Sequence, residues 1–126
     1  LIETGASVVV WNRSAEKCEP LRVRGATVAA SPAALAGLCE VIITILTDAE
    51  AIETVYRGRD GLLSGAVAGK LFIEMSTVRP QTEQALARDV AAAGAAFVEC
   101  PVGGTVGPAL KGQLIGFAGG DAAAVE

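Results

Sequence analysis

The stretch VIITIL, residues 41–46, decides the fold class. All six residues are apolar or β-branched, without the alternation of apolar and polar residues that marks a strand with one face in water. Such a run is typical of a central parallel strand that is covered by helices on both faces. On both sides of this segment in the sequence, the chain should therefore alternate between helices and strands.

The rest of the chain shows that alternation. Further strands are predicted over residues 7–12, 27–29, 70–75, 95–99 and 113–118. Helices are predicted over residues 15–24, 31–38, 47–56 and 80–93, with helix starts at Ser14, Ser31 and Thr47, helix stops at Gly25 and Gly94, and a last cap at Asp121. This order predicts an α/β domain with a Rossmann-like, doubly wound parallel sheet.

The N-terminal residues indicate that part of such a sheet precedes them. Leu1 to Gly5 has the pattern of a last helical turn with a glycine stop. In a dinucleotide-binding fold, the glycine-rich turn lies roughly 20 residues before the end of the second strand, which is Asn12 if residues 7–12 form that strand. We therefore expect residues 1–126 to be a partial domain that lacks the first strand and the glycine-rich turn. Segments 7–12 and 41–46 would then flank an empty strand position, and this segment alone would be marginally stable.

Composition limits the partners and the chemistry. The net charge is -4 and the ten Lys and Arg residues are scattered, so no nucleic-acid face is expected. No apolar run reaches the roughly 20 residues of a membrane span, and no basic leader is present, so we expect a cytoplasmic protein without a membrane partner. Three widely spaced cysteines and no histidine predict no metal site and no Ser-His or Cys-His nucleophile.

Asn12, Arg13 and Ser14 occupy the end of the predicted second strand, where a dinucleotide-binding fold reads the adenosine ribose. An acidic residue there would favour NAD, whereas Arg13 and the Ser14 hydroxyl would suit the 2'-phosphate of NADP. The alternative is a solvated arginine beside an ordinary helix cap, and the local pattern leaves both interpretations open.

Two further segments allow a ligand-binding and a structural interpretation. Ser76 and Thr77 follow a predicted strand, so they would either contact a cofactor at its carboxyl end or cap the helix ahead of Pro80. The stretch CPVGGTVGPALKGQLIGFAGG, residues 100–120, contains seven glycines. Its glycines would either bring backbone N–H groups against an anion or allow the positive φ of a long turn.

Together, these motifs resemble the beta-hydroxyacid dehydrogenase family, which includes 3-hydroxyisobutyrate dehydrogenase and the cofactor domain of 6-phosphogluconate dehydrogenase. The family's N-R-[ST] strand end is matched by residues 12–14, and its apolar-Leu-Pro turn by residues 45–47, with Thr47 in place of proline. Its D-x-S-T-x-x-P motif is matched by residues 74–80. Its D-A-P-V-S-G-G and A-x-x-G-x-L motifs are matched by residues 99–105 and 109–114, with Gly103 in place of serine and Thr105 in place of the second glycine.

The resemblance implies roles for named residues. Cofactor contacts, with NADP or NAD, are implied for Asn12, Arg13, Ser14, Leu46, Thr47, Asp48, Ser76 and Thr77. Contacts with the carboxylate of a small acid are implied for Gly103, Gly104 and Thr105.

The resemblance also implies an activity. It implies an oxidoreductase that interconverts a 3-hydroxy acid and its aldehyde or ketone, and a helical C-terminal domain through which the protein would form a homo-oligomer. The family's catalytic lysine would lie beyond Glu126, so these residues alone are expected to be inactive and Lys111 is not that lysine. An imine reductase and a non-catalytic NADP-binding module are the alternatives.

Overall fold

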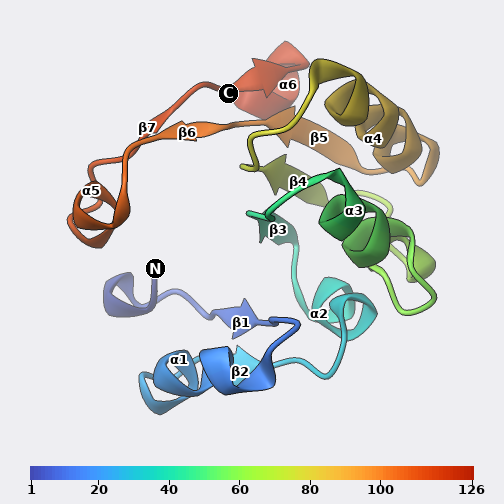
Figure 1. Ribbon diagram of the computed structural model, residues 1–126. Helices are drawn as coiled ribbons and strands as arrows, with labels where there is room; N and C mark the ends of the chain where they lie inside the picture. The colour runs from blue at the N-terminus through green and yellow to red at the C-terminus, as the bar shows by residue number, and fades with distance from the viewer.

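The strands form three separate hydrogen-bonded sets in the computed structural model, which describes residues 1–126 (Figure 1). The first is a parallel pair of β1 (Val9–Val10) and β2 (Thr27–Val28). The second has the order β3-β4-β5-β8, with β3 (Val41–Thr44), β4 (Leu71–Glu74) and β5 (Ala96–Glu99) parallel and β8 (Gly119–Gly120) antiparallel to β5. The third is an antiparallel pair of β6 (Val102–Gly103) and β7 (Ile115–Gly116).

The helices are short except for α4, which joins β4 to β5. In chain order the α-helices are α1 (Glu19–Val23), α2 (Pro32–Leu38), α3 (Ala49–Ile52), α4 (Pro80–Ala92), α5 (Val106–Leu110) and α6 (Ala122–Val125). Single turns of 3-10 helix are η1 (Ile2–Thr4), η2 (Ala15–Cys18) and η4 (Leu62–Ser64), and η3 (Glu53–Arg57) is a π-helix that continues α3. None of these helices has both the length and the apolar composition that crossing a membrane requires.

The core lies between the four-stranded sheet and the helices α3 and α4, which Figure 1 shows on one side of it. Ile42 of β3 and Phe72 of β4 are neighbours in the sheet and point into this core, where they are 1% and 0% exposed. Leu86 and Val90 of α4 pack against them from the helix side. The apolar spacing of α4 therefore buries one face of the helix on this sheet, as its sequence predicts.

The opposite face of β3 is open, which corrects the expectation that this strand is covered on both faces. Val41 and Ile43 are 49% and 48% exposed, so their burial alternates with that of Ile42 and Thr44. β3 is also an edge strand, because it bonds to β4 on one edge only. The mixed α/β class with a mainly parallel sheet is confirmed. β1 and β3 are not hydrogen-bonded to each other, which agrees with the empty strand position expected between segments 7–12 and 41–46.

Several helix ends agree with the sequence. Ser31 caps α2, because its Oγ accepts a hydrogen bond from the Ala34 N–H at 3.1 Å, and Pro32 opens the helix. Gly25 and Gly94 stop the preceding helices with positive φ angles of 104° and 80°. These three positions confirm the predicted helix limits.

Other predicted caps are wrong. Asp48, not Thr47, caps α3 with a 2.8 Å bond from the Ala51 N–H to Oδ1. Ser14 precedes η2, but its side chain makes no cap bond; its own N–H donates to Oδ1 of Asn12 at 2.9 Å. Asp121 precedes α6 without a side-chain cap bond. In each case the neighbouring backbone conformation, rather than residue type, decides which oxygen reaches a free N–H.

The glycine-rich stretch folds as a β-hairpin with an inserted helix. Val102 pairs with Gly116 and Gly103 with Ile115, while α5 lies in the connection (Figure 1). The predicted strand over residues 113–118 is therefore reduced to β7. A second short pairing follows it, because β8 lies antiparallel to β5.

We expect the two faces of β3 to respond differently to truncation. Ile42→Ala should lower the free energy of unfolding by about 2–5 kcal/mol, because it leaves a cavity in the core. Ile43→Ala, on the half-exposed face, should cost less than about 1 kcal/mol. Urea unfolding of both variants measures this difference, and equal losses would show that the Ile43 face is covered.

Candidate functional site

A buried carboxylate holds the carboxyl ends of β3 and β4 together. Glu74, the last residue of β4, is 0% exposed. Its Oε2 accepts hydrogen bonds from the hydroxyls of Thr44 and Tyr56, the latter at 3.1 Å, and the two hydroxyl oxygens lie 2.7 Å apart. Its Oε1 accepts the Ser76 N–H at 2.7 Å. Each carboxylate oxygen therefore has a donor, which offsets the cost of burying it.

Tyr56 is an uncharged partner in this cluster. Burial, followed by the nearby Glu74 carboxylate, raises the pKa of the Tyr56 hydroxyl far above its ordinary value. The hydroxyl therefore stays protonated and remains available as a hydrogen-bond donor.

Ser76 links the two loops that follow β3 and β4. It is only 3% exposed, and its Oγ accepts a hydrogen bond from the Leu46 N–H at 2.7 Å. Ser76 thus neither caps α4, whose N-cap position is Arg79, nor faces open solvent. The helix-cap interpretation is therefore wrong, whereas the cofactor contact stays a prediction, because the Ser76 hydroxyl can still donate a hydrogen bond while its oxygen accepts the Leu46 N–H.

A hollow lies beside these linked loops at the carboxyl ends of the strands. Its volume is about 370 Å³ and its lining comes from the loop after β3 and from the start of α4: Thr47, Asp48, Ala49, Thr77, Val78, Arg79 and Thr82. The structure therefore brings Thr47, Asp48 and Thr77, three of the residues predicted for the cofactor, into one concave surface. Crevices at this edge of a parallel sheet are where ligands bind in open α/β folds.

The Asp48 carboxylate is already engaged. One oxygen caps α3 and the other accepts the Thr47 hydroxyl at 3.2 Å. Thr77 and Arg79 are exposed, and Arg79 forms no ion pair. The free donors of the hollow are thus a guanidinium and hydroxyl groups, which suit an anionic group.

The Asn12–Ser14 corner forms a separate part of the predicted site. Asn12 and Ser14 are joined by their local hydrogen bond, and none of the three residues lines the hollow described above. Arg13 is exposed and has no carboxylate partner, unlike Arg22, Arg24 and Arg57, which all form ion pairs. Its guanidinium remains free for an anion such as a phosphate, so the donor set fits a phosphate-bearing nucleotide.

Gly103, Gly104 and Thr105 lie at the base of the glycine-rich hairpin. Gly104 has a φ of +131°, and a Cβ there would lie 2.7 Å from Cδ2 of Leu114, so its own chain already requires glycine. Gly103 lacks both constraints: a Cβ there would meet its neighbours at 3.5 Å or more. Gly104 and Thr105 are exposed, and the Thr105 side chain makes no cap bond to α5. Of these three positions, Gly103 is the one at which glycine has no evident structural reason.

Sequence reasoning missed the cluster of Thr44, Tyr56 and Glu74. The available signal is the glutamate that ends LFIE, because a carboxylate in an otherwise apolar central strand needs buried donors. Thr44 interrupts the apolar run of β3 in the same way, and the register pairs it with Glu74. Tyr56 could not be placed without the π-helix geometry of η3.

Comparison with protein families gives one match over the whole chain. Residues 1–126 match the model described as the NAD binding domain of 6-phosphogluconate dehydrogenase. This match agrees with the family resemblance drawn from the motifs.

Individual proteins match the chain over its full length, but the chain covers only part of each. It is 40% identical over 126 residues to glyoxylate/succinic semialdehyde reductase 1 of Arabidopsis thaliana and covers 44% of that protein. It is 35% identical over 126 residues to the cytokine-like nuclear factor N-PAC of Danio rerio and covers 27% of it. It also resembles the solved structure of Psf3 in complex with NADP+ and 2-OPP, with a TM-score of 0.91 and 34% identity, over 98% of this chain and 44% of that one.

We predict opposite roles for the neighbouring hydroxyls of Ser76 and Thr77. Ser76→Ala should lower the free energy of unfolding by roughly 1–3 kcal/mol, because it leaves the Leu46 N–H without its partner. Thr77→Ala, at an exposed position that makes no internal hydrogen bond, should change it by less than about 0.5 kcal/mol. Chemical unfolding of the two variants tests this assignment, which a large loss in Thr77→Ala would contradict.

Proposed function

The chain belongs to the family of the NAD binding domain of 6-phosphogluconate dehydrogenase, and from that membership we propose that it holds the nicotinamide cofactor of an oxidoreductase acting on a 3-hydroxy acid. The observation that carries this proposal is the hollow at the carboxyl ends of β3 and β4, whose free donors are hydroxyls and a guanidinium. The Ser76–Leu46 bond holds the two loops that frame it. The activity belongs to the whole protein, since the chain spans between 24% and 44% of four curated relatives.

NADP is proposed as the preferred cofactor. Arg13 is exposed and unpaired, and the residues beside it, Asn12 and Ser14, are not acidic. A 2'-phosphate would thus meet a guanidinium and no repelling carboxylate. The relative Psf3, which matches 98% of this chain, was solved with NADP+ bound, and this supports the same choice.

Several of the chain's own residues would align the reaction. The Glu74 cluster fixes where β3 and β4 end. From the loops that follow, the residues that would contact the cofactor are Leu46, Thr47, Asp48, Ser76 and Thr77. The cofactor supplies hydride transfer when bound. Backbone N–H groups of Gly103 and Gly104, with the Thr105 hydroxyl, would hold the carboxylate of the acid.

The acid–base group of the reaction is proposed to lie outside these 126 residues. Among the lysines, Lys70 has a structural role. Its Nζ donates hydrogen bonds to the carbonyl oxygens of Ala36 and Cys39 at 2.6 and 2.7 Å. Lys111 follows α5 on the exposed hairpin. Lys17, the third lysine, lies on η2, and none of the three lines the hollow at the carboxyl ends of β3 and β4.

Arg13→Ala in the intact protein should weaken NADP binding much more than NAD binding. Each lost charged hydrogen bond to the 2'-phosphate is worth about 1.5–3 kcal/mol, or roughly tenfold or more in Kd. Arg59→Ala is the matched control, because Arg59 is also exposed and unpaired. Titration of both cofactors into the three proteins measures the ratio, and equal losses for NAD and NADP in Arg13→Ala would rule out the assignment.

Gly103→Ala in the intact protein should lower kcat/KM for the acid substrate at least tenfold, which corresponds to about 1.4 kcal/mol. The added methyl group clashes with no atom of the chain, so the melting temperature should not change. NADP affinity should also be unchanged. Gly107→Ala, in open space on α5, is the control that should keep full activity.

Steady-state kinetics with a panel of 3-hydroxy acids, and with imines under reducing conditions, makes this measurement. Activity on imines alone would replace the proposal by an imine reductase. Tight NADP binding without turnover of either class would replace it by a binding module. Unchanged kinetics in Gly103→Ala would remove the substrate role of the hairpin.

A further inference from the structure

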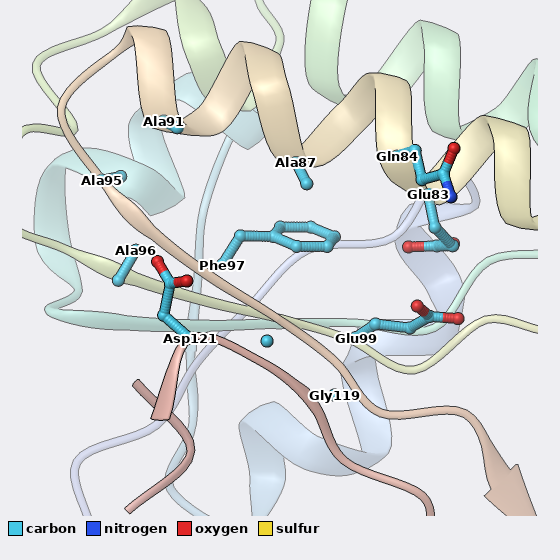
Figure 2. Close-up of a pocket in the computed structure, with 11 residues that line it drawn as sticks. Glu83, Gln84, Ala87, Ala91, Ala95, Ala96, Phe97, Glu99, Gly119 and Asp121 are labelled. Carbon is cyan, nitrogen blue, oxygen red and sulfur yellow. The ribbon is translucent and has the colours of Figure 1, made fainter. Parts of the chain in front are cut away.

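Glu83 of α4 is a buried carboxyl group that the fold leaves without a partner. The residue is only 3% exposed, and neither oxygen of its side chain has a hydrogen-bond partner. Figure 2 shows this side chain reaching from α4 toward Glu99 of β5. The buried carboxylate of Glu74 shows the contrast, because both of its oxygens have donors. Burying a charged carboxylate without donors is costly, so the state of Glu83 needs an explanation.

The burial of the two Glu83 oxygens limits what can neutralise them. Both are closed off from solvent, so a metal ion, an ammonium group or another side chain could contact them only if α4 moved away from the sheet. A proton needs no such space. Protonation removes the charge and is the usual response of a carboxyl group that is buried without a partner.

The charges around Glu83 favour the same outcome. The titratable groups that face it from the surrounding elements are Glu74 of β4, Glu99 of β5, Tyr56 of η3 and Asp121, which lines the same hollow. Arg79 and Arg88 of α4 are exposed and form no ion pair, and Arg57 of η3 pairs with other carboxylates. Burial raises the pKa of the Glu83 carboxyl to about 7, and the Glu74 and Glu99 carboxylates act in the same direction.

Glu83 lies on the face of α4 that packs on the sheet. The buried residues of this helix are Glu83, Leu86 and Val90, which follow one another at helical spacing. Leu86 and Val90 belong to the apolar core, so Glu83 is the one position of this buried face that can carry a charge. A charge there opposes the packing of the first turns of α4, whereas a neutral carboxyl group does not.

We propose that Glu83 holds a proton in the folded protein near neutral pH, and that loss of this proton loosens α4 from the sheet. The proton bonds to one of the two carboxylate oxygens when the pH falls and returns to water when the pH rises. The contact between α4 and the sheet is thus a pH-sensitive switch. It is independent of the proposed dehydrogenase activity, so each can fail without the other.

The direction of the pH effect on stability follows from linkage. A glutamate in an unfolded chain has a pKa of about 4.3, whereas that of Glu83 in the folded protein is about 7. Between these values the folded state binds the extra proton, so its contribution to stability is present at low pH and is lost as the pH rises through 7. Above about pH 8 both states are ionised and the effect is complete.

Urea unfolding of the intact protein between pH 5 and pH 8 measures this effect. Glu83→Gln has nearly the same shape and no titratable group. The unfolding constant of the wild type should therefore rise at least tenfold more than that of Glu83→Gln over this range. Glu16→Gln, which removes an exposed and unpaired carboxylate on η2, is the control and should behave as the wild type. The same pH dependence in the wild type and in Glu83→Gln would overturn the proposal.

Carboxyl NMR of the wild type tests the proton directly and does not depend on a variant that folds. In protein labelled with carbon-13 at the glutamate carboxyl groups, one resonance should titrate with a midpoint between pH 6 and pH 8. Glu83→Gln should lack this resonance, and Glu83→Met, which also cannot titrate, replaces that variant if it fails to fold. A wild-type spectrum in which every glutamate titrates below pH 6 would overturn the proposal.

Amide hydrogen exchange locates the loosening. At pH 8 the amides of residues 83–90 should exchange several-fold faster in the wild type than in Glu83→Gln, or in Glu83→Met if it replaces that variant, because only the wild type carries the buried charge. At pH 5.5, where Glu83 is protonated, the two proteins should exchange alike. Equal rates at pH 8 would show that the charge does not loosen α4 and would overturn the proposal.

Discussion

A carboxylate that is buried without any cation beside it determines how the central strands end. Glu74 receives its hydrogen bonds from three elements: Thr44 at the end of β3, Tyr56 on η3, and the backbone of Ser76 after β4. Because an unsatisfied carboxylate at this depth would cost several kcal/mol, all three donors must be in place together. The strand register, the path of the helix and the turn after β4 therefore depend on one side chain.

The π-helix η3 contributes to both the core and the Glu74 cluster. Val55 and Tyr56 are consecutive residues, and both are buried, at 8% and 0% exposure. Val55 joins the apolar core, and the Tyr56 hydroxyl reaches Glu74.

Local sequence patterns predicted where helices and strands lie better than they predicted what packs against them. The order of strands and helices, the α2 cap at Ser31 and the stops at Gly25 and Gly94 all follow from backbone preferences that act within a few residues. The burial of β3 does not follow from them. A run of apolar residues shows that the strand would be stable when buried, but it does not show that another element packs on each of its faces. The glycine-rich stretch shows the same limit: its composition allowed either a close backbone approach to an anion or the positive φ of a turn, and only the hairpin shows that Gly104 has a positive φ and Gly103 does not.

Side-chain chemistry was least visible in the sequence. The sequence offered a ligand contact or a helix cap for Ser76 and did not indicate that its hydroxyl oxygen accepts the N–H of Leu46, which lies 30 residues away in sequence. Contacts over such separations depend on the register between β3 and β4, which residue types alone do not specify. The exposed residues Arg13 and Thr77 remain candidates for ligand contacts because no internal partner occupies them.

The open edge of β3 divides its backbone amides into two groups that exchange hydrogen with water at different rates. Successive N–H groups of a strand point to opposite edges, and β3 is bonded to β4 on one edge only. Every second amide therefore sits in the sheet ladder, while the amides between them face away from it. In deuterated water the ladder amides would exchange only when the sheet opens, and those on the free edge would exchange almost at once. A single four-residue strand would thus record both the global stability of the domain and the accessibility of its edge.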